Sequence, residues 1–145
     1  MKHLAFAVAI GLLAALPAAA QNMASPVIVT PSQVVWNTND ALPPGVKIAT
    51  MEGDFTKPGW YTVRLHFDDG AKFPPHFHGS NEYVTVLSGT LLVGLGDKMD
   101  TAKMTPLPAG SYAGIPATVH HYAMAQGETV VQVSGPGPMT QTILK

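Results

Sequence analysis

Residues 70–89 read GAKFPPHFHGSNEYVTVLSG, and this stretch carries the main signal for both fold and function. Residues two apart on a β-strand share a face, so an extended chain would place His76 and His78 side by side. On a straight strand Glu82 would lie ~13 Å beyond His78, too far for the three side chains to meet. The intervening Gly-Ser-Asn, residues 79–81, is typical of a turn that folds the chain back. The stretch therefore predicts two imidazoles and a carboxylate gathered around one point.

The rest of the chain has the turn residues and strand lengths of an all-β protein. Its 14 glycines and 13 prolines separate short apolar stretches, and no segment after residue 20 sustains a helical period. Strands are predicted at residues 34–36, 46–51, 60–67, 82–87, 90–94, 103–107, 112–115, 121–125 and 129–133. Many short strands at this spacing favour a sandwich, a jelly roll or a closed barrel.

The first 20 residues resemble an export signal. Lys2 gives the positive start, residues 4–16 form an apolar run too short to span a bilayer, and Ala18-Ala19-Ala20 provides small residues for cleavage. We expect a signal peptide at 1–20, a lead-in segment at 21–33, one domain at 34–145, and a periplasmic or secreted product. The alternative is that the apolar run is retained as an N-terminal anchor.

Composition restricts the partners. The chain has no cysteine, so an exported protein of this size would depend on its core and its ligands rather than on disulfides. Its formal net charge is -1 and its basic residues are scattered singly, which argues against nucleic-acid and anionic-membrane partners. A small-molecule ligand and no membrane span are expected, and a homodimer is left open.

A metal site needs a third imidazole from elsewhere in the chain, and the adjacent His120 and His121 are the candidates. On a strand, His121 would share a face with the small Ala123 and Ala125, whereas His120 would share one with larger side chains. Strand parity alone does not decide between them. Imidazoles with one carboxylate suit a first-row divalent ion, so one ion of Fe, Mn, Ni or Zn is expected.

The same residues resemble a known family. The run Gly70-x5-His76-x-His78-x3-Glu82-x6-Gly89 is similar to the complete first motif of the cupins. A looser second motif is similar to residues 108–121, where the family's ligand position, counted from Pro116, falls on His121. The asparagine that usually closes this second motif is absent, and Ala125 stands there instead. Beyond the motifs, Trp36 and the tail Gly135-Pro-Gly-Pro138 resemble exported single-domain cupins.

The resemblance implies a single-domain cupin jelly-roll β-barrel that holds a metal on His76, His78, Glu82 and His121. Four ligands would leave up to two positions of an octahedral ion open, as catalysis requires. The first hypothesis is therefore a metalloenzyme of the dioxygenase, isomerase or lyase kind, with Glu82 also acting on protons as a catalytic residue. The alternatives are a non-catalytic module that binds a metal or a small ligand, and a metal-free structural cupin.

Strand parity also bears on three further polar residues. His66 lies in phase with Thr62 and Arg64 on the strand predicted at 60–67, so an outer, solvent-facing position is expected for His66 and Arg64. Gln132 shares a face with Val130, and either orientation of Gln132 is left open.

Overall fold

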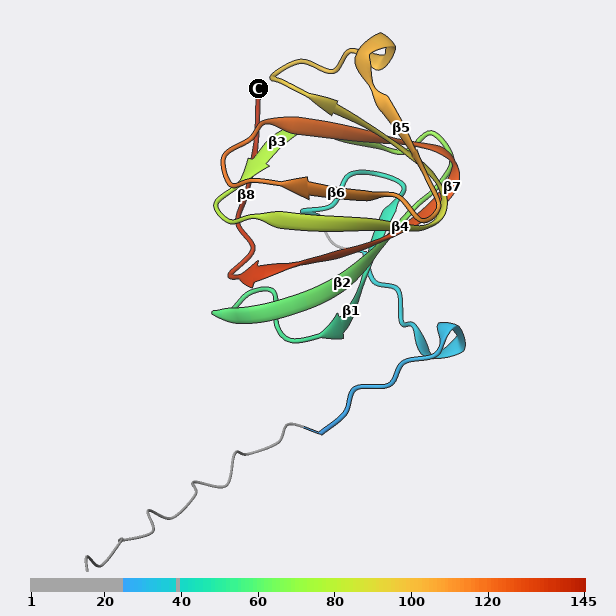
Figure 1. Ribbon diagram of the computed structural model, residues 1–145, viewed down its shortest axis with the longest axis vertical. Coiled ribbons are helices and arrows are strands. Elements are labelled where there is room, and N and C mark those ends of the chain that lie inside the picture. The colour runs from blue at the N-terminus through green and yellow to red at the C-terminus, as the bar shows by residue number, and fades with distance from the viewer. Residues whose placement is uncertain (1–24, 39) are drawn as a thin grey trace, which may run out of the picture.

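The computed structural model describes residues 25–38 and 40–145, and these form a barrel of antiparallel strands (Figure 1). The strands are β1 (Val46–Glu52), β2 (Gly59–Phe67), β3 (Lys72–His78), β4 (Glu82–Leu95), β5 (Thr105–Pro108), β6 (Tyr112–Ile115), β7 (His121–Gly137) and β8 (Gln141–Ile143). Two short 3-10 turns, η1 (Pro31–Gln33) and η2 (Thr101–Lys103), are the helical elements of the described residues. The predicted all-β jelly-roll barrel is confirmed.

Strand β7 organises the barrel because it pairs with three other strands. Its second half, residues 129–137, pairs with β2, and its first half pairs with β3. Along its other edge it pairs with β4, from His121 opposite Leu95 to Ser134 opposite Tyr83. One long strand thus joins the two sides of the sheet and brings the beginning of β7 beside β3.

Alternation along the strands separates a core from an outer surface. On β2, Tyr61, Val63 and Phe67 are buried and Leu65 packs against them, while Thr62, Arg64 and His66 alternate with these residues on the outer face. Val131 and Val133 of β7 are buried to the same degree. These side chains meet inside the barrel, where they remove apolar surface from water.

The glycine that ends the quoted stretch is required by close packing. Gly89 has a φ of 73° and lies where β4 bends, and a Cβ there would lie 2.8 Å from the Cα of Thr129 and would also clash with the Glu128 carbonyl oxygen. Gly70 has the same φ of 73°, but a Cβ there would meet open space. Gly70 thus serves backbone conformation alone, whereas Gly89 also allows two strands to approach closely.

The strand boundaries differ from those predicted. The strands predicted at 82–87 and 90–94 form one strand, β4, because shifts in register around Ser88 let it bend without losing its pairing with β7. Those predicted at 121–125 and 129–133 likewise merge into β7, which continues to Gly137. Residues 34–36 are not a strand; next to them, Asn37 makes an isolated bridge with Ile48. Strands β3 and β8 were missing from the predicted set.

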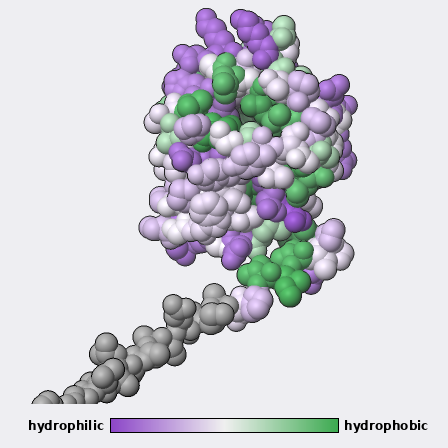
Figure 2. Space-filling model, viewed as in Figure 1, coloured by the Kyte–Doolittle hydropathy of each residue, from purple (hydrophilic) through white to green (hydrophobic). Residues whose placement is uncertain are grey.

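The described part of the lead-in lies outside the barrel. Figure 2 shows hydrophobic side chains on this segment beside the grey atoms, and Ile28 is 81% exposed. Within residues 25–38 and 40–145, no helix is long and apolar enough to cross a membrane. The predicted signal peptide, residues 1–20, lies outside the described residues.

Candidate metal centre

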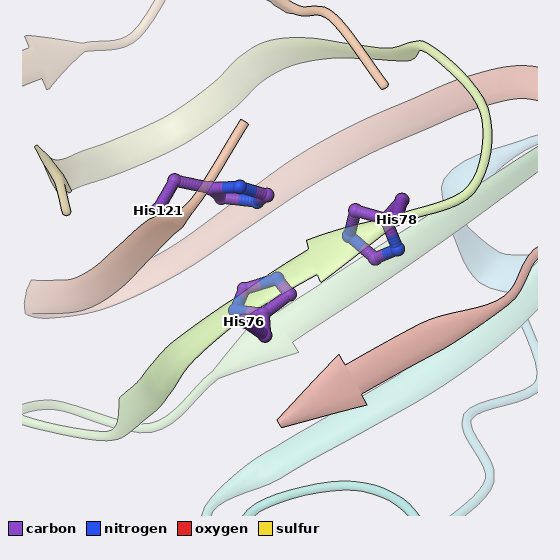
Figure 3. A group of neighbouring side chains, drawn as sticks. All are labelled: His76, His78 and His121. Atoms are coloured by element: carbon purple, nitrogen blue, oxygen red, sulfur yellow. The ribbon is translucent and has the colours of Figure 1, made fainter. Parts of the chain in front are cut away.

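The site forms where the beginning of β7 lies against the end of β3. His76 is paired directly with His121, and His78 follows on the same face of β3. One ring nitrogen from each of the three histidines lies within 4.8 Å of the other two. Figure 3 shows the three rings turned toward a common space, although they come from segments far apart in the sequence. All three side chains are buried in the barrel.

Backbone carbonyls fix the orientation of each ring. Nδ1 of His76 lies 2.7 Å from the Pro74 carbonyl oxygen, and Nδ1 of His121 lies 3.0 Å from that of Val119. Nδ1 of His78 lies 2.9 Å from the carbonyl oxygen of Thr140. A carbonyl oxygen only accepts hydrogen bonds, so each Nδ1 carries the proton in these contacts. The Nε2 lone pairs of the neutral rings are then free to bind a metal ion.

Glu82 lies beside two of these histidines. Its Oε1 is 3.6 Å from Nε2 of His78, and its Oε2 is 3.3 Å from Nε2 of His121. The predicted reversal at residues 79–81 explains this placement: Asn81 Oδ1 accepts a hydrogen bond from the Ala117 backbone, which ties the turn to a neighbouring loop. Nε2 of His78 is itself buried and has no hydrogen-bond partner within the described residues.

Burial and close charges change the proton affinities of the site. Burial, then the neighbouring His121, lowers the pKa of His76 from 6.5 to about 4. Burial is the largest single influence on Glu82 and His121 and opposes ionisation of both, but their mutual hydrogen bond and the close charges together outweigh it, lowering the pKa of Glu82 and raising that of His121. Burial, with the nearby Glu82 carboxylate, raises the pKa of the Tyr61 phenol to about 12. In the metal-free protein these shifts favour a proton on His121 Nε2 facing the Glu82 carboxylate, and a metal ion binding there would replace that proton.

The four side chains face a largely apolar cavity inside the barrel. Its volume is about 60 Å³, whereas one water molecule needs roughly 10–15 Å³. Phe73 packs on the inner side of the site, with its ring centroid 4.6 Å from that of His76. The cavity thus has room for a few water molecules or a small ligand.

The other candidate histidine faces away from this cavity. Nδ1 of His120 lies 2.6 Å from Oδ1 of Asp97, and its ring stacks on Phe77 at a centroid separation of 5.0 Å. His120 and His121 are adjacent on an extended backbone, so their side chains take opposite faces. The structure places His121, and not His120, with His76 and His78.

The remaining polar residues lie on the outer face of β2 and β7. His66 lies beneath the Trp36 ring with Nε2 3.2 Å from a Glu128 oxygen, and the side chain of Arg64 lies 3.4 Å from the Gln132 amide oxygen. His66 and Arg64 lie on the outer face as expected, and Gln132 does not enter the cavity. The His66 side chain is not solvent-facing, however: it is only 15% exposed, with Trp36 packed against its ring.

The C-terminal segment contributes to the site in a way that the sequence patterns did not predict. Besides the Thr140 carbonyl that orients His78, this segment supplies Met139 and Gln141 to the cavity wall. Strand β8 has three residues, too few to show an alternating pattern, and only its pairing with β3 reveals its role.

The family model for the cupin domain matches residues 63–134, which include all four candidate site residues. The chain belongs to the cupin superfamily. No curated protein matches this cupin.

Solved structures share the fold at low sequence identity. An RmlC-like cupin from Shewanella frigidimarina is 20% identical with a TM-score of 0.61, covering 78% of this cupin and 93% of its own chain. KdgF from Halomonas sp. is 21% identical with a TM-score of 0.61, covering 78% and 96%. The polyketide cyclase RemF from Streptomyces resistomycificus is 17% identical with a TM-score of 0.65, covering 81% and 86%. These likenesses concern the fold alone.

Proposed function

We propose that this cupin binds one divalent metal ion through His76, His78, Glu82 and His121 and acts as a metalloenzyme on a small oxygen-containing molecule. The observation that carries the proposal is the state of the histidine nitrogens. Each Nδ1 is held by a backbone carbonyl, and the buried Nε2 of His78 has no hydrogen-bond partner within the described residues. An unpartnered buried polar atom is costly unless something binds it.

The donor set fits the proposed ion. Three neutral imidazoles and one carboxylate are ligands that Fe, Mn, Ni and Zn all accept, and they leave positions open for a small molecule. When bound, such an ion would act as a Lewis acid on a ligand oxygen, or with iron would supply dioxygen chemistry. The backbone carbonyls behind the three histidines would hold their rings in place for the ion. Glu82 is the cavity group that could accept a proton from the ligand.

The chemistry of the wall also keeps a second function open. Among the described residues that line the cavity, Glu82 is the only carboxylate and no lysine is present. If Glu82 is committed to the metal, the site has no separate general base. This favours the alternative that the protein is a non-catalytic module that binds a metal or a small ligand.

Metal content and stability test the metal site. The purified protein, loaded separately with Fe, Mn, Ni or Zn, should retain about one ion per chain by elemental analysis. Because the ion binds only the folded state, saturation at 100 times the dissociation constant should stabilise the protein by ~2.7 kcal/mol. This corresponds to a rise in melting temperature of roughly 8 to 10 °C, which a chelator should reverse. A melting temperature indifferent to both metal and chelator would contradict the metal site.

Turnover separates the two functions. On the enzyme proposal, activity found by screening the metal-loaded protein with small oxygenated compounds should fall by ~100-fold or more in Glu82→Gln, which keeps the shape of the side chain but loses its charge. Tight ligand binding without turnover for every metal would favour the binding module.

We also propose that the chain is exported and that the mature protein begins near Gln21. Residues 1–20 support this proposal, because they combine a positive start, an apolar run and small residues at the expected cleavage site. Intact-mass analysis of the protein from a periplasmic fraction should show loss of the first 20 residues, and retention of Met1 would contradict it.

A further inference from the structure

The wall of the cavity is unusually poor in charge. Apart from the three histidines and Glu82, the described residues that line it comprise Gln141 and fifteen apolar side chains. None of them is a lysine or an arginine. The Arg64 side chain is engaged by Gln132 on the outer face, and Lys47, Lys57 and Lys103 pair with surface aspartates. Any charge on a bound ligand must therefore be balanced by the metal and Glu82.

This balance favours a ligand with one negative charge. A divalent ion and the Glu82 carboxylate together carry one net positive charge, because the three histidines bind as neutral rings. A singly charged ligand brings the sum to zero, whereas a doubly charged ligand leaves one uncompensated negative charge among apolar side chains. An uncompensated charge in such surroundings is strongly unfavourable.

Gln141 is the one uncharged polar side chain in this wall, and it lies next to a proposed ligand. It stands directly opposite His78 in the pairing of β3 with β8, so the two side chains share the inner face. The side-chain amide of Gln141 forms no hydrogen bond within residues 25–38 and 40–145. An amide can both donate to and accept from a bound molecule without changing the net charge of the site.

We propose that the site selects small, singly charged molecules that chelate through two oxygens, such as an enolate or a 2-hydroxy acid with one carboxylate, and that Gln141 hydrogen-bonds to such a molecule while leaving the charge of the wall unchanged. The inference rests on the proposed metal site and specifies the class of its ligand. The same reasoning disfavours dicarboxylates, although their chelating oxygens would suit the metal equally well.

Glycolate and oxalate are matched probes, because both chelate through two oxygens but carry one and two negative charges. Their affinities are measured by titration calorimetry on the Mn-loaded full chain and compared with those for Mn²⁺ in the same buffer. We expect the ratio of oxalate to glycolate affinity to be lower on the protein than for the free ion by ~10-fold or more. A ratio equal to or above that of the free ion would overturn the proposal.

Two variants of Gln141 sharpen the test. Gln141→Lys adds a cation to the wall and should raise the oxalate-to-glycolate ratio by ~10-fold. Gln141→Leu should weaken glycolate binding by ~5-fold through loss of one hydrogen bond. Thr142→Lys is the matched control. Thr142 is exposed on the opposite face of β8, so a lysine there adds the same charge outside the cavity. An equal change of the ratio in Thr142→Lys would overturn the role of Gln141.

The outcomes distinguish this inference from the proposed function. If the protein takes up no Mn²⁺, both fail together. If it holds Mn²⁺ but shows the ratio of the free ion, only the charge selectivity fails. Should Gln141→Lys not give a cooperative melting curve, the wild-type ratio and Gln141→Leu decide the question.

Discussion

The described histidines fall into two groups that differ in what their ring nitrogens contact. In the inner group, formed by His76, His78 and His121, every Nδ1 faces a backbone carbonyl. In the outer group, His66 and His120, the ring nitrogens face carboxylates: His66 lies between Asp68 and Glu128, and His120 contacts Asp97. Both groups sit on strands of the same barrel, and some members are neighbours in sequence.

This difference separates a potential ligand from a surface polar residue. A carbonyl behind Nδ1 fixes the ring and leaves the Nε2 lone pair directed at the cavity. The outer rings instead direct their donors at acids that remain exposed to water, where a salt bridge contributes little. Changes to the inner group should therefore affect metal binding and acid stability far more than changes to the outer group.

Removal of an inner ring should affect metal binding far more than removal of its outer neighbour. His121→Ala should weaken metal affinity by ~1000-fold or more, because it removes a direct ligand. His120→Ala should lie at or below the ~10- to 100-fold typical of groups behind the ligands. Competition with a chromophoric chelator would measure both affinities, with circular dichroism checking that the barrel persists. Equal losses, or a larger loss at His120, would reverse the assignment.

The metal-free protein should lose stability in mild acid because of the inner group. The unfolded chain protonates His76 near pH 6.5, whereas the folded protein does so only near its lowered pKa of about 4. The unfolded state therefore binds more protons across this window, and stability should fall by up to about 3 kcal/mol as the pH drops from 6.5 to 4. Urea denaturation in the presence of a chelator would measure the fall.

The pair formed by Glu82 and His121 changes the stability mainly outside that pH window. The raised pKa of His121 gives stability that is present below pH 6.5 and is lost as the pH rises through its folded value. The lowered pKa of Glu82 gives stability that is lost only as the pH falls below 4.5 and through its folded value.

Two variants test the role of His76. His76→Gln should reduce the fall in stability between pH 6.5 and 4, and the outer variant His120→Gln should retain it. An unchanged slope in His76→Gln would contradict the role of His76.

The smallest effect is expected at the outer pair. Asp97→Asn removes the charge that faces His120, but the Asp97 side chain is 74% exposed. Exposed ion pairs contribute ~0.2 to 1 kcal/mol, so the free energy of unfolding should change by no more than that. Metal affinity, measured by the same chelator competition, should not change. A clear loss of affinity would mean that the outer group supports the site after all.

Much of the fold could be predicted from local sequence patterns. Alternation on residues 60–67 separated the buried Tyr61 and Val63 from the outward Arg64 and His66, because strand parity depends only on positions along the chain. The turn at residues 79–81 was likewise read from residue types. The full lengths of β4 and β7 could not be predicted in this way. Glycines usually end strands, but here bulges and the close approach of the two strands accommodate them.

The sequence by itself determined that His76, His78 and Glu82 would lie together, because one strand and one turn connect them. The resemblance to the second motif favoured His121 over His120 as their partner, but strand parity left the choice open, and the tertiary structure decided it. Parity states that these two rings face opposite ways, but the register of His76 against His121 decides which way is inward. The same holds for the Thr140 carbonyl and Gln141, which reach the site through pairing between strands more than sixty residues apart. Such long-range registers are set by packing of the whole barrel rather than by any local pattern.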